Sequence, residues 1–466
     1  MKKLTSIFLL AAMMTTAAFA EIDPAKRIFE LGVDADVVAT ENILSINDIF
    51  QETIVFDLTK IYNDMGRDGF VVRAAATPDV YTKVRIGGFG AGIDVNVDFS
   101  GSVGIGKDFF KLLAEGNTVG EEISTTLSAN LQSFVTVSAP VYFRVGKLRF
   151  SATPSVFAPL VYLPTPNAKF TALVNDDGTM SAVANADIAL CSVVDLGCLF
   201  AEDGSFTGDF SAITDNLGGL ASEIGHSLGF DLAATAEYPL FDFLDVGAYA
   251  SIPLVPGRTK YKVKGTVTAS AELDEALLDK LLSKSSEEGE SAESGESSES
   301  GEGSESGSSG SSEGSTESGE GSESGGEEEK FYTVDYNLSA LEEKETINRP
   351  LRFGVRAAWR PINTKLLKIA LKPSLGFAAR NPFGSDFGWK SMYMEYDLYA
   401  DLTLAYIFNM SLSSAYINQV FRQSVGFAFN FRVFELDVGV SSSNTDFLKS
   451  FALYGAEAKV GVKLGF

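Results

Sequence analysis

The sequence contains very few of the residues on which metal and covalent chemistry usually depend. Among 466 residues there is one histidine, His226, and there are two cysteines. A metal site built from nitrogen and sulfur ligands needs more of these residues at closer spacing. His226 and Ser227 are neighbours at the start of a predicted strand, so their side chains should face opposite sides and should not act together as base and nucleophile. The sequence therefore predicts no metal site, no cofactor and no enzyme.

Long apolar segments are also absent, except at the N-terminus. Lys2 and Lys3 precede an apolar stretch from Leu4 to Ala18, and a small-x-small cleavage site ends at Ala20. These features predict a secretory signal peptide over residues 1–20, and no nearby cysteine indicates a lipoprotein. Beyond Ala20 no segment approaches the roughly 18 apolar residues of a membrane-spanning helix. The mature chain, 21–466, is therefore expected to be exported and to lack such a helix.

Basic residues are outnumbered, and the acidic excess is concentrated in one segment. The net charge is −25, and Ser283–Glu329 is a Ser/Glu/Gly-rich tract whose single basic residue is Lys284. An acidic chain is a poor partner for nucleic acid. The tract has almost nothing apolar to bury, so it should stay disordered. Functionally it would bind cations or repel anions; the favoured alternative is a solvated loop of variable length.

The strongest positive signal is the alternation of the C-terminal segment, Phe451–Phe466. One set of alternate residues is apolar and the other is small or charged, and a period of two sends the two sets to opposite faces of a strand. This pattern is typical of a transmembrane β-barrel strand. Gly461, Leu464 and Phe466 also resemble the sorting signal that presents Gram-negative outer-membrane proteins to the barrel-assembly machinery. The expected partners are therefore outer-membrane lipid and that machinery, and the oligomeric state stays open.

The same period of two recurs along the chain and predicts about 14 strands. The predicted strands are Phe29–Val38, a shorter one near Lys83–Gly88, Gly92–Gly104, Gln132–Val145, Leu148–Leu163, Leu228–Tyr238, Val246–Leu254, Leu351–Arg360, Leu366–Arg380, Ser391–Phe408, Met410–Tyr416, Phe421–Arg432, Phe434–Ser443 and the C-terminal strand. An even count places both termini in the periplasm. The predicted fold class is all-β: a transmembrane antiparallel up-and-down β-barrel with short helices and long extracellular loops.

Strand parity sorts the connections into short periplasmic turns and long outer loops. The long loops are Asn381–Lys390, Pro164–Gly225 and Val255–Pro350, and this asymmetry is the one expected of such barrels. The last of them holds the acidic tract, together with strand-like pieces at Thr259–Ser270 and Phe331–Asn337. The tract should therefore lie outside the cell.

The two cysteines, Cys191 and Cys198, lie close together in one of these outer loops. Exported thiols are normally paired, because the compartment is oxidising. The sequence therefore predicts a disulfide that closes a small loop.

Charged side chains gather on the inner face of three consecutive predicted strands, 351–360, 366–380 and 391–408. The first two strands present basic residues and the third presents acidic ones: Arg352, Arg356, Arg360, Lys368, Lys372, Arg380, Glu395, Asp397 and Asp401. Opposite charges that are neighbours on one face should pair across strands. They would either set up a transverse field in a polar pore or cross-brace a lumen too full to conduct. The narrowness of a fourteen-stranded barrel favours bracing.

Two further segments carry a resemblance. Around Asp98–Asn117 a strand that ends in VDFSGSVGIG is followed by a short helix, KDFFKLLAEGN, and Leu228–Leu254 is a hairpin. With the strands, they resemble an uncharacterised bacterial outer-membrane β-barrel family and, more remotely, the long-chain fatty-acid outer-membrane transporter group. That group implies an N-terminal hatch in the barrel, whereas only Glu21–Ile28 precedes the first strand here. Two helical stretches within Glu41–Asp68 are the nearest substitute, as a lumen plug or as an outer lid.

The predicted function is passage of small molecules across the outer membrane, with hydrophobic molecules as one candidate class. A small-solute porin is the first alternative, and the charged inner wall suits it better. A non-transporting surface scaffold or adhesin that displays Val255–Pro350 is the second. An apolar pocket beside Glu41–Asp68 would favour the transporter. Sustained conductance in a planar bilayer would favour the porin, and a lumen that is closed in every state would favour the scaffold.

Overall fold

The structure is a computed structural model that describes eleven stretches of the chain. They are residues 27–41, 58–65, 69–116, 118–164, 166–196, 224–273, 332–380, 382, 391–431, 433–451 and 456–466. The predicted signal peptide, the acidic tract and Cys198 lie outside these residues. Among the helices in the described stretches, none is long and apolar enough to cross a membrane.

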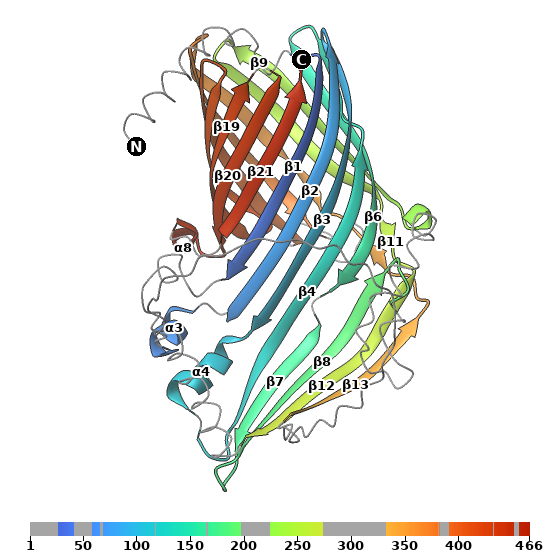
Figure 1. Cartoon of the computed structure of the whole chain (residues 1–466), viewed down its shortest axis with the longest axis vertical. Helices are drawn as coiled ribbons and strands as arrows, with labels where there is room; N and C mark the ends of the chain where they lie inside the picture. The colour runs from blue at the N-terminus through green and yellow to red at the C-terminus, as the bar shows by residue number, and fades with distance from the viewer. Residues whose placement is uncertain are drawn as a thin grey trace, which may run out of the picture.

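Most strands of the main sheet close into a ring (Figure 1). Each strand pairs antiparallel with the next, and the last strand pairs with the first from Glu30↔Gly465 to Ala39↔Ala456. In order around the ring the strands are β1 (Phe29–Glu41), β2 (Phe70–Ile86), β3 (Phe89–Ile105), β4 (Glu122–Ser138) continued by β5 (Val141–Val145), β6 (Leu148–Leu163), β9 (Gly229–Phe241), β10 (Leu244–Val255), β15 (Leu351–Asn363), β16 (Leu367–Ala379), β17 (Met392–Leu404), β18 (Phe408–Ile417), β19 (Val420–Phe431), β20 (Phe434–Asn444) and β21 (Ala456–Gly465). The prediction of an all-β, closed antiparallel barrel is confirmed.

A second part of the same sheet extends beyond the ring. It consists of β7 (Asn167–Val174), β8 (Met180–Ser192), β12 (Tyr261–Leu273) and β13 (Tyr332–Leu341), which pair in that order. The first half of β4 pairs with β7 and the second half with β6, so β4 belongs to both parts. We call these four strands the projecting sheet; Figure 1 shows them at the end of the molecule opposite the C-terminus.

The strand count differs slightly from the prediction, because the main sheet holds nineteen strands rather than about fourteen. The projecting sheet accounts for most of the difference. Its strands β12 and β13 confirm the strand-like pieces predicted at Thr259–Ser270 and Phe331–Asn337, but β7 and β8 lie where Pro164–Gly225 was predicted to be a loop. Both strands alternate, as Lys169 and Thr171 against Phe170 and Ala172 show on β7, but the apolar face of each includes several alanines, so the pattern is weak.

Two ring strands depart most from their predicted bounds. The predicted strand Gln132–Val145 is interrupted at Pro140, which has no N–H to donate to a neighbouring strand, and this separates β4 from β5. Strand β2 is much longer than the strand predicted near Lys83–Gly88. Its first half contains three consecutive alanines and Pro78, so the period of two is not visible there.

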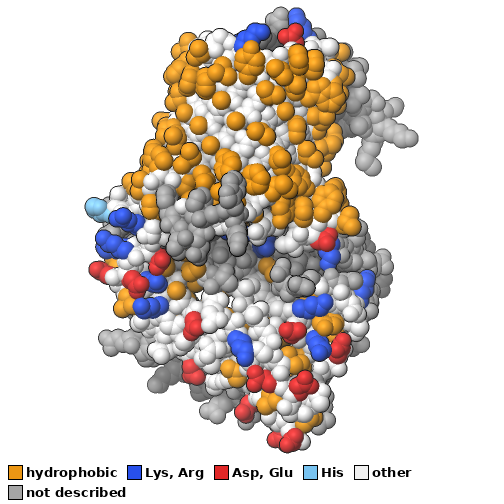
Figure 2. Space-filling model, turned by 180° about the vertical axis from the view of Figure 1, so that it is seen from behind, with side chains coloured by type: hydrophobic (Ala, Val, Ile, Leu, Met, Phe, Trp, Pro, Cys, Tyr) orange, Lys and Arg blue, Asp and Glu red, His pale blue; other side chains and the backbone are white. Residues whose placement is uncertain are grey.

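An apolar band surrounds the part of the ring nearest the C-terminus (Figure 2). Outward side chains such as Leu398, Val440 and Val460 are 55%, 62% and 51% exposed. Inward residues on the same strands are polar, as Glu435 and Asp437 are on β20. Figure 2 shows charged side chains gathered below the band and few within it. Apolar outside and polar inside is the arrangement of a barrel whose wall faces hydrocarbon.

The helices lie outside the ring of strands. Helix α3 (Leu58–Asp64) falls within a predicted helical stretch and lies near α4 (Lys107–Glu115), where the Lys107 ammonium donates to the Met65 carbonyl at 3.0 Å. Figure 1 shows both helices beside the ends of β2 and β3, next to the projecting sheet. The described part of Glu41–Asp68 therefore forms no plug inside the ring, and it lies at the rim; the rest of that segment is outside the described residues.

Candidate functional site

The inner wall of the ring carries a ladder of ion pairs across β6, β9, β10 and β15. Arg356 Nη2 lies 2.6 Å from Glu237 Oε1, and Arg360 Nη2 lies 2.5 Å from Asp245 Oδ2. Arg149 on β6 contacts the same two carboxylates. The basic face predicted for β15 is thus largely neutralised by two acids, Glu237 and Asp245, that the sequence analysis did not single out.

The predicted acidic strand, β17, pairs with two other basic residues. Arg352 Nε lies 3.1 Å from Glu395 Oε2, and Lys372 Nζ lies 2.6 Å from Asp401 Oδ1. Both pairs bridge neighbouring or next-neighbouring strands on the inner face. This geometry braces the wall of the lumen, as one of the two interpretations of the charges requires.

The remaining three predicted luminal charges have different surroundings. The Lys368 ammonium lies 4.2 Å from the centre of the Tyr406 ring. Arg380 lies just beyond the end of β16 and donates to the Gln419 side-chain carbonyl at 3.3 Å. Asp397 faces the lumen, and one of its buried carboxylate oxygens has no hydrogen-bond partner among the described residues.

A cavity of about 380 Å³ lies against this braced wall. The Tyr249 ring has room there because Gly354 and Gly376 lack side chains; a Cβ at either position would come within 2.8 Å or 2.3 Å of Tyr249 atoms. The polar side chains that line the cavity are Glu237, Asp245, Tyr249, Arg356, Lys372, Ser374, Asp397 and Tyr399. Carboxylates, cations and phenols together can exchange hydrogen bonds with a polar solute.

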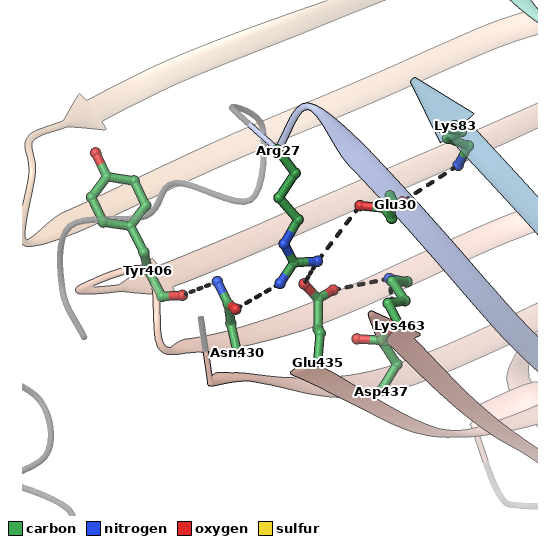
Figure 3. Close-up of polar contacts among 8 residues, drawn as sticks. All are labelled: Arg27, Glu30, Lys83, Tyr406, Asn430, Glu435, Asp437 and Lys463. Carbon is green, nitrogen blue, oxygen red and sulfur yellow. Dashed lines mark hydrogen bonds and ion pairs between the residues drawn. The ribbon is translucent and has the colours of Figure 1, made fainter. Parts of the chain in front are cut away.

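A second ion-pair cluster joins the first and the last strands of the ring (Figure 3). Arg27, which precedes β1, has a side chain only 1% exposed, and its Nη1 lies 3.1 Å from Glu435 Oε2. Arg27 Nη2 donates to Asn430 Oδ1 at 2.7 Å, and Lys463 Nζ donates to Glu435 Oε1 at 2.9 Å. The sequence analysis missed Arg27, because only closure of the ring places it beside β20.

An apolar cluster on the inner wall was also missed. Phe134 on β4 pairs in register with the inward Asp98, and Phe157 on β6 pairs with Thr136. The two aromatic side chains pack against Ile347 and Tyr162. Ile347 belongs to a segment that is not part of the ring of strands. Phe157 lies in a run that is apolar on both faces (SVFAPLVYL), and this is the one signal that the sequence offered.

The residues of the predicted assembly signal lie on or beside β21. Leu464 and Phe466 are exposed on the outward face, whereas Gly461 is buried on the inward face. The Phe466 carbonyl accepts the backbone N–H groups of Ile28 at 2.8 Å and Phe29 at 3.1 Å. The terminal residue therefore helps to close the ring, and its recognition by the assembly machinery stays a prediction.

The residues with reactive side chains form no site of their own in the described part of the chain. His226 is exposed while Ser227 is buried, and no group of three or more potential metal ligands occurs among the described residues. Cys191 is buried at the end of β8, where burial raises the pKa of its thiol above the ordinary value. Because Cys198 lies outside the described residues, the disulfide stays a prediction.

Comparison with known proteins finds barrels with very different sequences. No protein-family model and no curated protein matches the chain. Solved structures that resemble it include the translocator domain of the autotransporter NalP from Neisseria meningitidis (8% identity, TM-score 0.33, covering 100% of this chain and 98% of that one). Another is the toluene transporter TbuX of Ralstonia pickettii (8% identity, TM-score 0.37, covering 97% of this chain and 94% of that one). A third is the toluene transporter TodX of Pseudomonas putida (7% identity, TM-score 0.39, covering 94% of this chain and 89% of that one). Likenesses this distant do not decide the function, and the relation to the fatty-acid transporter group is not shown.

Proposed function

We propose that the protein is an outer-membrane β-barrel that lets small molecules cross the membrane through its lumen. The closed ring, the apolar band and the polar inner wall support placement in a bilayer. With the C-terminus in the periplasm, the projecting sheet lies outside the cell. The observation that carries the proposal is the cavity of about 380 Å³ on the inner wall, because such a space beside charged side chains holds water and small solutes.

The lining of the cavity favours small polar solutes. Arg356 and Lys372 are already paired with carboxylates, so the wall has little net positive charge to attract an anion. Asp397 adds a third carboxylate to the lining, beside Glu237 and Asp245, and the phenols of Tyr249 and Tyr399 add donors and acceptors. A neutral solute rich in hydroxyl groups matches this set better than a hydrocarbon does.

Hydrophobic solutes are the second candidate, and a different region favours them. Phe134, Phe157, Tyr162 and Ile347 form an apolar cluster on the inner wall near the projecting sheet, and in this structure they bury one another. A hydrocarbon that took the place of Ile347 against the two aromatic rings would keep their apolar area out of water. The two candidates therefore differ in which part of the lumen binds the solute.

Uptake into liposomes tests the proposal. Purified full-length protein is reconstituted, and entry of a labelled monosaccharide is compared with entry of a labelled fatty acid. The sugar should enter faster than into protein-free liposomes, and Tyr249→Ala, which removes a ring from the cavity, should speed it further. Tyr336→Ala on β13 is the matched control and should change nothing. Entry of the fatty acid alone would favour the second candidate, and entry of neither would leave a surface scaffold.

A further inference from the structure

The chain re-enters the ring after it leaves the projecting sheet. Between the end of β13 and the start of β15, residues Glu343–Pro350 run back toward the lumen, and we call this segment the strap. Within it the short strand β14 (Thr346–Ile347) pairs with β11 (Gly257–Arg258). Figure 1 shows β11 beside β6, at the level where the barrel meets the projecting sheet. The strap therefore lies at the outer end of the proposed passage.

The inner end of the strap is fixed by one arginine. The Arg349 guanidinium lies 4.3 Å from the centre of the Phe157 ring and 5.3 Å from that of Phe134. Its Nη1 lies 3.3 Å from Asp231 Oδ2, and its Nη2 donates to Thr136 Oγ1 at 2.5 Å. A cation over two rings, an ion pair and a hydrogen bond thus hold one side chain. These partners come from β4, β6 and β9, so the strap is attached to the inner wall.

An apolar contact adds to this attachment. Ile347 is only 4% exposed and packs on Phe134 and Phe157. Phe157 has room because Gly229 and Gly257 lack side chains; a Cβ at these positions would come within 2.3 Å and 2.8 Å of its ring. The site is shaped around the aromatic ring that Arg349 covers.

The outer end of the strap is fixed to the projecting sheet. Lys262 Nζ on β12 lies 3.2 Å from Glu343 Oε1 and 2.9 Å from Glu345 Oε2, and Lys264 Nζ lies 3.1 Å from Glu343. Hydrogen bonding to Glu345 and then to Glu343 raises the pKa of Lys262 against a smaller effect of burial, so this cation stays charged at neutral pH. The backbone N–H of Thr259 also donates to the Glu345 carbonyl at 3.0 Å.

We propose that the strap is a gate at the outer end of the lumen, with Arg349 as its latch. The proposal rests on the passage proposed above, because a gate needs a path to control. One end of the strap is attached to the inner wall and the other to the β12–β13 hairpin, so a ligand that displaces the hairpin pulls on the latch. Release of Arg349 leaves the buried Asp231 carboxylate without its cation and uncovers Phe157, so the closed state is favoured in the free protein.

Conductance in a planar bilayer is the first test. Arg349→Ala should raise single-channel conductance or open time severalfold over the unaltered protein. Arg349→Lys, which keeps the charge beside Asp231 but loses the planar stack on the rings, should fall between them. Lys169→Ala, which removes an exposed ion pair on β7, is the matched control and should leave conductance unchanged. Folding of each variant is checked by heat-modifiability on a gel.

Thiol accessibility is the second test, and it does not depend on transport. In a chain with Cys191→Ser and Cys198→Ser, the added Ile347→Cys should react slowly with a membrane-impermeant maleimide. Adding Arg349→Ala should speed the reaction at least tenfold, because the strap leaves the wall. If folded protein reacts at the same rate with and without Arg349, the latch is overturned. If the Arg349→Ala variant reacts fast but shows no conductance, the strap does move, but the proposed passage through the lumen is rejected.

Discussion

The ring and the projecting sheet share β4 but place their side chains by different rules. In the ring, the outward residues are apolar and the inward residues form partly buried ion pairs, such as that of Arg27 with Glu435. At the junction of β4 with the projecting sheet, one ion pair is largely exposed: the side chains of Lys169 and Glu122 are each 59% exposed. One antiparallel sheet thus carries an exposed apolar band on the ring and an exposed ion pair beyond it. The strand geometry is the same in both regions, but the apolar face is exposed in the ring, whereas Ala172 and Val263 of the projecting sheet are buried.

The edges of the two regions also differ. The ring has none, because β21 pairs with β1, and an unpaired backbone would be very unfavourable in hydrocarbon. In the projecting sheet, β13 pairs with β12 alone among the described strands. Water satisfies the outer backbone groups of such an edge, so closure is not required there.

The largest expected difference concerns ion pairs. Glu435→Ala should lower the free energy of unfolding by about 3–5 kcal/mol, because it leaves the buried Arg27 without its closest carboxylate. Glu122→Ala, at the exposed pair of the projecting sheet, should cost less than about 1 kcal/mol. Urea titration of refolding into lipid vesicles measures both. Equal losses would mean that the luminal pair is as well solvated as the outer one.

The next effect concerns the outward face. Val438→Arg should cost about 2–4 kcal/mol if this residue lies near the bilayer midplane. The inward Gly439→Arg should cost far less, and so should Val183→Arg on the projecting sheet. The same vesicle titration compares all three variants. A similar loss on both faces of β20 would overturn the assigned register and with it the apolar band.

The C-terminal aromatic residue should have a smaller effect, expressed in assembly. Phe466→Ser keeps the backbone carbonyl but removes a ring whose centre lies 5.6 Å from that of Phe29. The amount of heat-modifiable protein in the outer membrane should fall while export continues. Leu341→Ser, at the end of β13, is the matched control and should leave the amount unchanged. Undiminished assembly of Phe466→Ser would count against the predicted sorting signal.

Removal of the acidic tract should have the smallest effect. Ser283–Glu329 has too little apolar surface to repay the entropy of ordering, so its deletion should leave the thermal stability of the barrel nearly unchanged. An epitope inserted near Gly310 should be reached by antibody on intact cells, because it belongs to the β12–β13 connection. If the epitope is reached only after permeabilisation, the projecting sheet faces the periplasm and the proposed orientation is reversed.

The sequence predicted the ring strands well where one face meets an apolar medium. The predicted strand Leu148–Leu163 has the bounds of β6, and the predicted strands Phe421–Arg432 and Phe434–Ser443 match β19 and β20 to within one residue at each end. The C-terminal strand was predicted from Phe451, but β21 begins at Ala456 and Phe451 ends the short helix α8 (Phe447–Phe451). The sequence pattern failed at β7 and β8, because several residues on the apolar face of each strand are alanines, which make the alternation weak. The position of the helices within Glu41–Asp68 relative to the barrel could not be predicted either, since a helical pattern does not say what the helix packs against.

The candidate site divides in the same way. The alternation along each strand predicts that Arg356, Lys372 and Asp397 point into the lumen, but it does not predict which side chains they contact. Arg356 pairs with Glu237 from a strand that is far away in the sequence, and Arg349 was not considered because it lies in a predicted loop. Pairing across a barrel depends on the stagger between strands, which the local sequence does not state.

By itself, the sequence determined that this chain makes strands with one apolar face. Apolar residues recur at every second position, and alternate side chains of a strand point to the same face. The sequence also predicts that Ser283–Glu329 belongs to no core, since it has so little apolar surface to bury. Only the tertiary structure decided that Arg27 meets Glu435 when the ring closes, and that Arg349 re-enters the lumen between Phe134 and Phe157. Those contacts join residues hundreds of positions apart, or elements without periodicity. Their geometry is set by how the whole sheet curls and staggers, and that is not present in any local stretch of sequence.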